Sequence, residues 1–274
     1  MFLLNGEPAH CIDPADRGLQ YGDGLFETLE VRQGRPLFLD RHLRRLASGC
    51  RRLMIPMPDA GLLEAEALSF AAGREAAVLK LIVTRGCGGR GYRQPDVIQP
   101  TRLFSLHPYP DYPAHYQTDG IVADFCRQRL SSNATLAGIK HLNRLEQVLA
   151  RAEWSDDSRQ EGLMLDVQNY VVEGTMSNLF IVKNGVLLTP ALTDCGVAGI
   201  VREWSLAFAA AEGLPSVEAA ITVDQVLAAD EVFVTNSVIG IWPVRRLAGQ
   251  DFPVGQVTQR ICAAYRLAKQ RELS

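Results

Sequence analysis

The chain has 274 residues, of which 47% are hydrophobic and 22% charged, and its formal net charge is -3. This length is enough for two domains of ordinary size. The near-neutral charge favours neither a nucleic acid nor a membrane surface as the partner, and the sequence has no run of about 18 apolar residues, which a membrane-spanning helix requires.

The N-terminal stretch MFLLNGEPAH has too short an apolar run for a signal peptide, so we expect a cytoplasmic protein. The cysteines are scattered and include no CxxC pair, which argues against a zinc site or a thioredoxin-like motif. Free thiols in a reducing cytoplasm are expected instead. The six cysteines are Cys11, Cys50, Cys87, Cys126, Cys195 and Cys262.

The beginning of the chain predicts strands followed by a helix. A hairpin is expected around Asn5-Gly6, then a strand over residues 25–31 and a return strand over residues 36–39. Asp40 is the expected N-cap of a helix with one buried side. The leucines on that side are Leu43, Leu46 and Leu53.

A second helix is expected over residues 60–72, followed by an apolar strand over 76–84 and the glycine-rich sequence RGCGGRGY. Three of these glycines fit the letters GxGxxG, but a dinucleotide-binding fingerprint must open a helix. The chain continues as YRQPDVIQP, whose prolines block a helix, so we reject that interpretation. The loop suits close backbone approach to an anionic ligand; the alternative is a bent loop with solvated arginines.

A strand over residues 101–107 leads into HPYPDYPAHYQTDG, whose prolines and polar residues are typical of a linker. We therefore expect two domains, 1–114 and 115–274. The second domain should open with a strand over 121–126, and a polar loop then leads to Lys140.

Lys140 is one of only four lysines among the 28 Lys+Arg residues. The apolar residues behind it recur at helical spacing and predict a helix with one buried face. They are Leu142, Leu145, Leu149 and Ala152. A partly buried lysine can lose its proton and act as a nucleophile or base, which arginine cannot do. Taken alone, however, a lysine in front of a helix is more often a plain surface residue.

Residues 161–190 predict an antiparallel meander with a tight turn at Asn184-Gly185. Glu173 stands in an otherwise apolar run of this meander. A buried carboxylate needs a partner, although Glu173 is equally consistent with an exposed acid at a strand end.

Residues 195–202 form a glycine-rich turn that opens a helix, and such a turn presents free N–H groups to an anion. An ordinary loop-to-helix turn would have the same pattern. Farther on, Asn236 and Ser237 interrupt an apolar run. These two polar residues belong either to a functional site or to a plain turn between two strands. An amphipathic helix over 253–273 closes the chain.

Taken together, several segments resemble the fold-type IV pyridoxal phosphate enzymes, which include branched-chain aminotransferases, D-amino-acid aminotransferases and 4-amino-4-deoxychorismate lyases. The matching segments are GIKHLNRLEQ, GDGLFET, HLRRL, EGTMSN and GIVR. KHLNRLEQVLAR and RGCGGRGY resemble the lyases most, as does Phe26, where a D-amino-acid aminotransferase would carry a tyrosine. The resemblance covers nearly the whole chain.

The resemblance implies an α/β (α+β) fold of the D-amino-acid aminotransferase type. A smaller N-terminal α/β domain would pack on a larger C-terminal domain, with pyridoxal 5'-phosphate in the cleft between them, and the enzyme would be a homodimer. The implied reaction is the elimination of pyruvate from 4-amino-4-deoxychorismate to give 4-aminobenzoate for folate synthesis. No metal is implied.

The resemblance also implies roles for individual residues. Lys140 would bind the cofactor and act as the base, and either Lys140 or Thr28 would protonate the leaving group. The other implied cofactor-binding residues are Glu173 at the pyridine nitrogen and, at the phosphate, Arg45, Ile200, Val201, Asn236 and Ser237. The implied substrate-binding residues are Phe26, Arg85, Arg90 and Tyr92.

Two alternatives stay open. An aminotransferase for D- or branched-chain amino acids would use the same Lys140, Glu173 and Arg45. A binding protein that kept the fold without the cofactor would be expected to lack one of these three residues, and the sequence contains all three.

Overall fold

The computed structural model describes residues 2–274, which divide into two compact units. Unit 1 comprises the described residues up to Pro110 together with Ile139–Asn143 and Lys269–Ser274, and unit 2 comprises Asp111–Gly138 and Arg144–Ala268. The predicted division into 1–114 and 115–274 treats each domain as one continuous segment. It did not anticipate that the residues around Lys140 group with the N-terminal strands.

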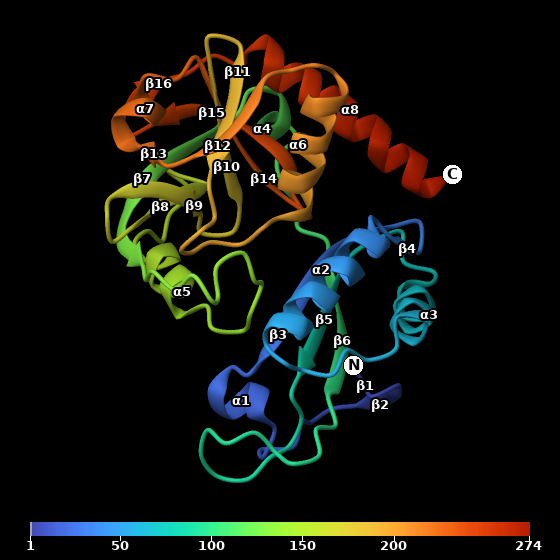
Figure 1. Cartoon of the computed structure of the whole chain (residues 1–274). Helices are drawn as coiled ribbons and strands as arrows, with labels where there is room; N and C mark the ends of the chain where they lie inside the picture. Colours follow the sequence, from blue (N-terminus) through green and yellow to red (C-terminus); the bar gives the residue numbers. More distant parts are fainter. Residues whose placement is uncertain (1) are drawn as a thin grey trace. The chain divides into compact units, whose positions relative to one another are not determined.

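Unit 1 is built on a six-stranded sheet with the order β2-β1-β6-β5-β3-β4, in which every neighbouring pair is antiparallel (Figure 1). Its strands are β1 (Phe2–Leu4), β2 (Glu7–Ala9), β3 (Gly24–Arg32), β4 (Arg35–Pro36), β5 (Ala76–Thr84) and β6 (Thr101–Pro108). Its helices are α1 (Arg17–Tyr21), α2 (Leu39–Arg52) and α3 (Ala60–Ala71). The hairpin predicted around Asn5-Gly6 is confirmed as the β1–β2 pair.

The core of unit 1 lies between the apolar face of its sheet and the apolar faces of helices α2 and α3. Alternate residues of β3, such as Leu25 and Leu29, point to the same side of the sheet as Leu79 of β5. Leu46 of α2 and Leu63 of α3 are fully buried against them. Burial of this apolar surface is the main free-energy gain that holds the unit together.

Two local predictions in unit 1 were wrong. The return strand is only Arg35–Pro36, and α2 begins at Leu39 with Phe38, not Asp40, as its N-cap. Phe38 has a left-handed backbone (φ 54°) and is 6% exposed. Burial of this large ring decides where the chain turns, and Asp40 is left in the first helical turn, where its charge still suits the helix dipole.

Unit 2 is built on a ten-stranded mixed sheet with the order β12-β11-β10-β14-β15-β7-β8-β9-β13, and β16 pairs with β15. Its strands are β7 (Ile121–Leu130), β8 (Glu161–Asp166), β9 (Tyr170–Gly174), β10 (Asn178–Lys183), β11 (Val186–Pro190), β12 (Ser216–Ala219), β13 (Ile221–Thr222), β14 (Glu231–Asn236), β15 (Gly240–Leu247) and β16 (Gln250–Asp251). Its helices are α4 (His115–Thr118), α5 (Leu145–Arg151), α6 (Ile200–Ala211), α7 (Val223–Leu227) and most of α8 (Gln256–Leu273).

The tight turn predicted at Asn184-Gly185 is confirmed, and the meander has a second turn of the same kind. Strands β8 and β9 are joined through Asn169 (φ 68°), and β10 and β11 are joined through Asn184 (φ 49°) and Gly185 (φ 75°). Asparagine and glycine tolerate this left-handed backbone better than other residues. The short helix α7 begins with a capping box formed by Thr222 and Gln225.

The helix behind Lys140 differs from its prediction. Helix α5 begins at Leu145, and its leucines are not buried: Leu145 is 76% exposed and Leu149 is 57% exposed. Ala150 makes the buried contact instead. The apolar spacing identified a helix correctly, but its apolar side does not face the core of this chain.

Residues 85–100 contain no helix, which confirms the rejection of the dinucleotide-binding interpretation. Within the described part of the chain, no helix is long and apolar enough to cross a membrane.

Leu79→Ala should lower the free energy of unfolding by about 2–5 kcal/mol, because it empties a fully buried position at the centre of the unit 1 sheet. Urea denaturation would measure the change. Leu62→Ala, at a position on α3 that is 42% exposed, is the matched control and should change stability much less. Equal losses from the two substitutions would contradict the described core.

Candidate active site

Lys140 is held in unit 1 by backbone pairing with the start of β3. The N–H of Phe26 donates to the Lys140 carbonyl at 3.0 Å, and the N–H of Leu142 donates to the Gly24 carbonyl at 3.0 Å. Neighbouring residues of an extended segment point to opposite faces. Ile139 therefore enters the core, while the Lys140 Nζ lies 4.3 Å from the centre of the Phe26 ring.

A second lysine lies on the same face. Lys80 of β5 is directly opposite Thr28 of β3, and its Nζ is 5.2 Å from the centre of the Phe26 ring. An aromatic face attracts ammonium groups at such distances. Of the predicted residues, the structure thus brings Lys140, Phe26 and Thr28 onto one face. It adds Lys80, which the sequence signalled only as a lone charge in the apolar run AAVLKLIVT.

On the other face of β3, Arg45 is anchored by a buried carboxylate. Arg45 donates to the two oxygens of Glu27, from Nε at 2.9 Å and from Nη2 at 2.5 Å. The side chain of Arg45 is 13% exposed, whereas that of Arg44 beside it is 67% exposed. Arg45 is therefore largely buried, unlike Arg44, and its guanidinium has a fixed orientation.

His42 completes this group. Its Nδ1 lies 2.6 Å from Glu27 Oε2, and both side chains are buried. Burial would raise the pKa of Glu27, but Arg45 and His42 outweigh it and lower the pKa to about 2. Burial is the main influence that lowers the pKa of His42, and Arg45 and Lys140 add to it. The sequence analysis missed Glu27 and His42; the i, i+3 spacing of His42 and Arg45 on one helical face was the available signal.

The predicted substrate-binding arginines lie in different surroundings. Arg85 is 4% exposed; it pairs with both oxygens of Asp23 (2.8 and 3.0 Å) and donates to the carbonyls of Leu53 and Met54 at 2.8 Å. Arg90 and Tyr92 are exposed, and Tyr92 reaches 86%. Arg90 and Tyr92 are thus accessible to a ligand, whereas the guanidinium of Arg85 already bonds Asp23 and two backbone carbonyls.

In unit 2, Glu173 is a buried carboxylate on β9, 4% exposed. It accepts a hydrogen bond from the Val197 N–H at 2.8 Å and one from Gln147 Nε2 at 3.4 Å. Arg144 interacts with it electrostatically: burial lowers the pKa of Arg144, while Glu173 and Glu146 act in the opposite direction. Glu173 is therefore not an exposed acid at a strand end.

Helix α6 begins three residues after Val197, whose N–H donates to Glu173, and it has no side-chain cap. Gly199 is its N-cap, and Ile200 and Val201 form its first buried turn. A Cβ at Gly199 would lie 2.0 Å from Asn178 Oδ1, so any larger residue there would have to displace the Asn178 side chain. The first N–H groups of a helix have no intrahelical partners, and this turn can receive an anion.

Asn178 and Asn236 hold the surrounding loops, and the sequence analysis missed Asn178. Asn178 Nδ2 donates to the Val197 carbonyl at 2.8 Å. Asn236 accepts from the N–H groups of Val238 and Ile239 at 2.8 Å and donates to the Met176 carbonyl at 3.0 Å. The amide of Asn236 is thus engaged in shaping the turn that carries Ser237.

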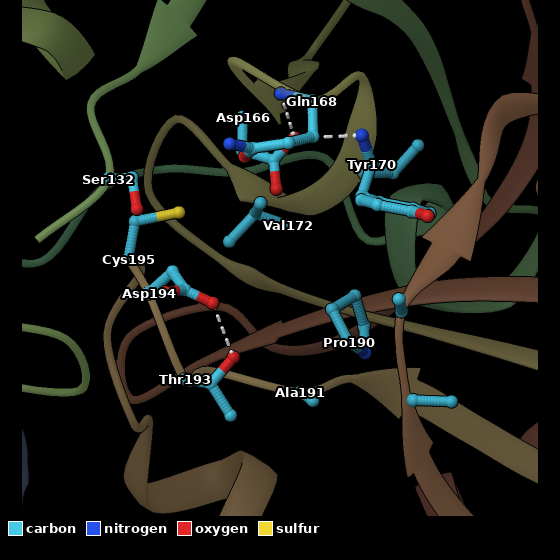
Figure 2. Close-up of a pocket in the computed structure, with 13 residues that line it drawn as sticks. Ser132, Asp166, Gln168, Tyr170, Val172, Pro190, Ala191, Thr193, Asp194 and Cys195 are labelled. Carbon is cyan, nitrogen blue, oxygen red and sulfur yellow. Dashed lines mark hydrogen bonds between the residues drawn. The ribbon is translucent and has the colours of Figure 1, made fainter. Parts of the chain in front are cut away.

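Unit 2 also contains a cavity of about 220 Å³ that includes none of the predicted site residues (Figure 2). Asp166 accepts from the N–H groups of Gln168 and Tyr170 at its rim, and Thr193 donates to Asp194. Burial, reinforced by nearby carboxylates, raises the pKa of Cys195 to about 12, so its thiol stays protonated.

Comparison with known proteins identifies relatives along the whole chain. Residues 24–247 match the family model described as amino-transferase class IV. An aminodeoxychorismate lyase from Vibrio harveyi is 38% identical over 265 residues, which cover 95% of this chain and 98% of the relative.

Solved structures match as well. The crystal structure of 4-amino-4-deoxychorismate lyase from Pseudomonas aeruginosa has a TM-score of 0.94 and 50% identity, covering 97% of this chain and 98% of that chain. The branched-chain amino acid aminotransferase of Escherichia coli has a TM-score of 0.86 and 26% identity, covering 99% and 95% of the two chains.

The interactions of Glu27 with Arg45 and His42 predict that the free energy of unfolding falls in acid. Because the folded-state pKa lies below the ordinary value of 4.5, the ion pair stabilises the fold above that pH and is lost as the pH falls toward 2. Between pH 5 and pH 2.5, the wild type should lose about 2–3 kcal/mol more unfolding free energy than Glu27→Gln. Urea titrations at each pH would measure this. Asp40→Asn, at an exposed carboxylate, should keep the wild-type slope.

Proposed function

The chain belongs to the class IV aminotransferase family, and on this basis we propose that it acts as an aminodeoxychorismate lyase. It would convert 4-amino-4-deoxychorismate into 4-aminobenzoate and pyruvate, a step toward folate. The observation that carries the proposal is the likeness to the Pseudomonas aeruginosa lyase over nearly the full length of both chains. The matches to solved structures also confirm the predicted fold class.

Enzymes of this family use pyridoxal 5'-phosphate, and the donor groups described above fit it. The cofactor has three polar ends: an aldehyde, a phosphate dianion and a pyridine nitrogen. Lys140 offers an amine for the first. Arg45, with its guanidinium fixed by Glu27, and the N-terminal turn of α6 offer donors for the second. Glu173 offers a buried carboxylate for the third. We propose that Ser237 adds its hydroxyl to the phosphate donors.

When bound, the cofactor supplies a conjugated ring that accepts the electron pair left by a departing proton. Lys140 would hold the cofactor, and its amine, once free, would remove the proton from the amine-bearing carbon of the substrate. Glu173 would accept a hydrogen bond from the protonated pyridine nitrogen and would keep that nitrogen charged. Either Lys140 or Thr28, which lie on the same face of the unit 1 sheet, protonates the departing pyruvate oxygen.

The substrate carries two carboxylates and therefore requires at least two cationic partners. Arg90 is exposed in the glycine-rich loop, and Lys80 lies beside the Phe26 ring. We propose that these two residues bind the carboxylates and that Phe26 and Tyr92 contact the ring. Arg85 was expected as a second carboxylate ligand; because Asp23 and two carbonyls occupy its guanidinium, we now assign it to holding the loop.

An aminotransferase is the second candidate, since the fold is shared with the Escherichia coli branched-chain enzyme. That reaction would use the same Lys140, Glu173 and Arg45 but would need a 2-oxo acid to return the cofactor to its starting form. A lyase needs no second substrate, so the two activities are separable by assay.

We propose that the protein is a homodimer that works in the cytoplasm. Helix α5 exposes Leu145, Val148 and Leu149, each at least 57% accessible, and such a row of apolar side chains favours contact with a second copy. All six cysteines are free thiols, which a reducing compartment maintains.

Cofactor-loaded wild type should release 4-aminobenzoate from 4-amino-4-deoxychorismate without any 2-oxo acid, and Lys140→Ala should be nearly inactive because it lacks the base. Lys183→Ala, at an exposed lysine paired with Asp230, is the control and should stay active. If the yellow wild type made no 4-aminobenzoate but transaminated D- or branched-chain amino acids with 2-oxoglutarate, the lyase proposal would be wrong.

Glu173→Gln should bind the cofactor but lose about 100-fold or more in kcat, because a neutral amide cannot hold the pyridine nitrogen in its charged form. Steady-state kinetics and the absorbance of the bound cofactor would measure the two effects. Glu153→Gln is the matched control, because Glu153 likewise accepts backbone N–H groups (from Arg127 and Gln128). Full activity in Glu173→Gln would exclude this role.

A further inference from the structure

The glycine-rich loop, residues 86–93, is wrapped around one buried side chain, that of Arg17. The Arg17 Nη1 donates to the Gly91 carbonyl at 3.0 Å and to the Arg93 carbonyl at 3.4 Å, and Nη2 donates to the Tyr92 carbonyl at 3.5 Å. A Cβ on Gly88 would lie 2.9 Å from Arg17 Cδ, so the loop also packs on the aliphatic stem of this arginine. Arg17 is 3% exposed.

Asp23 fixes the guanidinium from the opposite side. Asp23 Oδ2 accepts from Arg17 Nε at 2.9 Å and from Arg85 Nε at 2.8 Å. Burial would raise the pKa of Asp23, but the two arginines outweigh it and lower the pKa. One carboxylate therefore orients two arginines, one at the base of the loop and one inside it.

Tyr21 adds a third support. Its hydroxyl accepts from the Gly91 N–H at 3.1 Å, and its ring meets the Tyr92 ring edge-on with the centres 5.6 Å apart. The Arg17 guanidinium lies over the Tyr21 ring at 4.9 Å. The backbone of the loop is thus held from inside, which leaves the side chains of Arg90 and Tyr92 directed to solvent.

We propose that Arg17 is a positioning residue that sets the conformation of the glycine-rich loop and thereby the affinity of the enzyme for its anionic substrate. The inference rests on the proposed function, because it assigns Arg90 of this loop to a substrate carboxylate. An arginine is required because its planar fork reaches three carbonyls and a carboxylate at once. Lysine is a single point charge on a flexible stem and cannot span these acceptors.

The test is Arg17→Lys in the cofactor-loaded enzyme. The KM for 4-amino-4-deoxychorismate should rise tenfold or more while kcat stays within about twofold, and the absorbance of the bound cofactor should not change. Arg17→Lys combined with Arg90→Ala should raise KM little more than Arg90→Ala alone, because both changes act through the same contact. Arg102→Lys is the matched control: it alters another paired arginine of unit 1, which bonds Glu66, away from the loop.

A second readout does not depend on the substrate. Trypsin should cut after Arg90 or Arg93 faster in Arg17→Lys than in the wild type or in Arg102→Lys, because a loosened loop enters the protease more easily. Faster cleavage with an unchanged KM would overturn the link to substrate binding, and unchanged cleavage would overturn the positioning role itself. If the wild type made no 4-aminobenzoate, the proposed function would fail, while the cleavage rates would still decide whether Arg17 holds the loop.

Discussion

The candidate site in unit 1 depends on the backbone pairing between Ile139–Asn143 and the start of β3. Two hydrogen bonds of 3.0 Å attach this segment as a short extension of the sheet. Because its residues alternate between faces, burial of Ile139 in the core obliges Lys140 to point toward Phe26. The lysine is thereby positioned by rigid sheet geometry and not by the loop that precedes it, as a reacting group requires.

Paired buried charges give the site its rigidity. Glu27 lies between Arg45 and His42, and Asp23 lies between Arg17 and Arg85. In each group the desolvation of a carboxylate is offset by a guanidinium at hydrogen-bond distance. These ion pairs also restrict the conformational freedom of the arginine side chains. A guanidinium held in one orientation can receive an anion, or shape a loop, without a further entropic penalty.

The same set of cofactor-binding groups suits more than one reaction. A lysine amine, a carboxylate for a pyridine nitrogen and donors for a phosphate are needed by lyases and aminotransferases of this family alike, so they do not separate the two activities. The distinction between them lies in groups that meet the substrate. The groups that we propose for this role are Lys80 beside the Phe26 ring and the exposed side chains of a loop built around Arg17.

The sequence by itself determined most strands and helices, because the apolar run of β5, the helical spacing in α2 and the asparagine and glycine turns of the β8–β11 meander are local signals. Its motifs also pointed to Lys140, Glu173 and Arg45. Only the tertiary structure decided the partners. These include the N-cap at Phe38, the exposed leucines of α5, the occupied guanidinium of Arg85 and the contacts of Arg17 and Lys80, all of which depend on residues distant in the chain. No local pattern encodes such contacts, because packing selects them only when the whole chain folds.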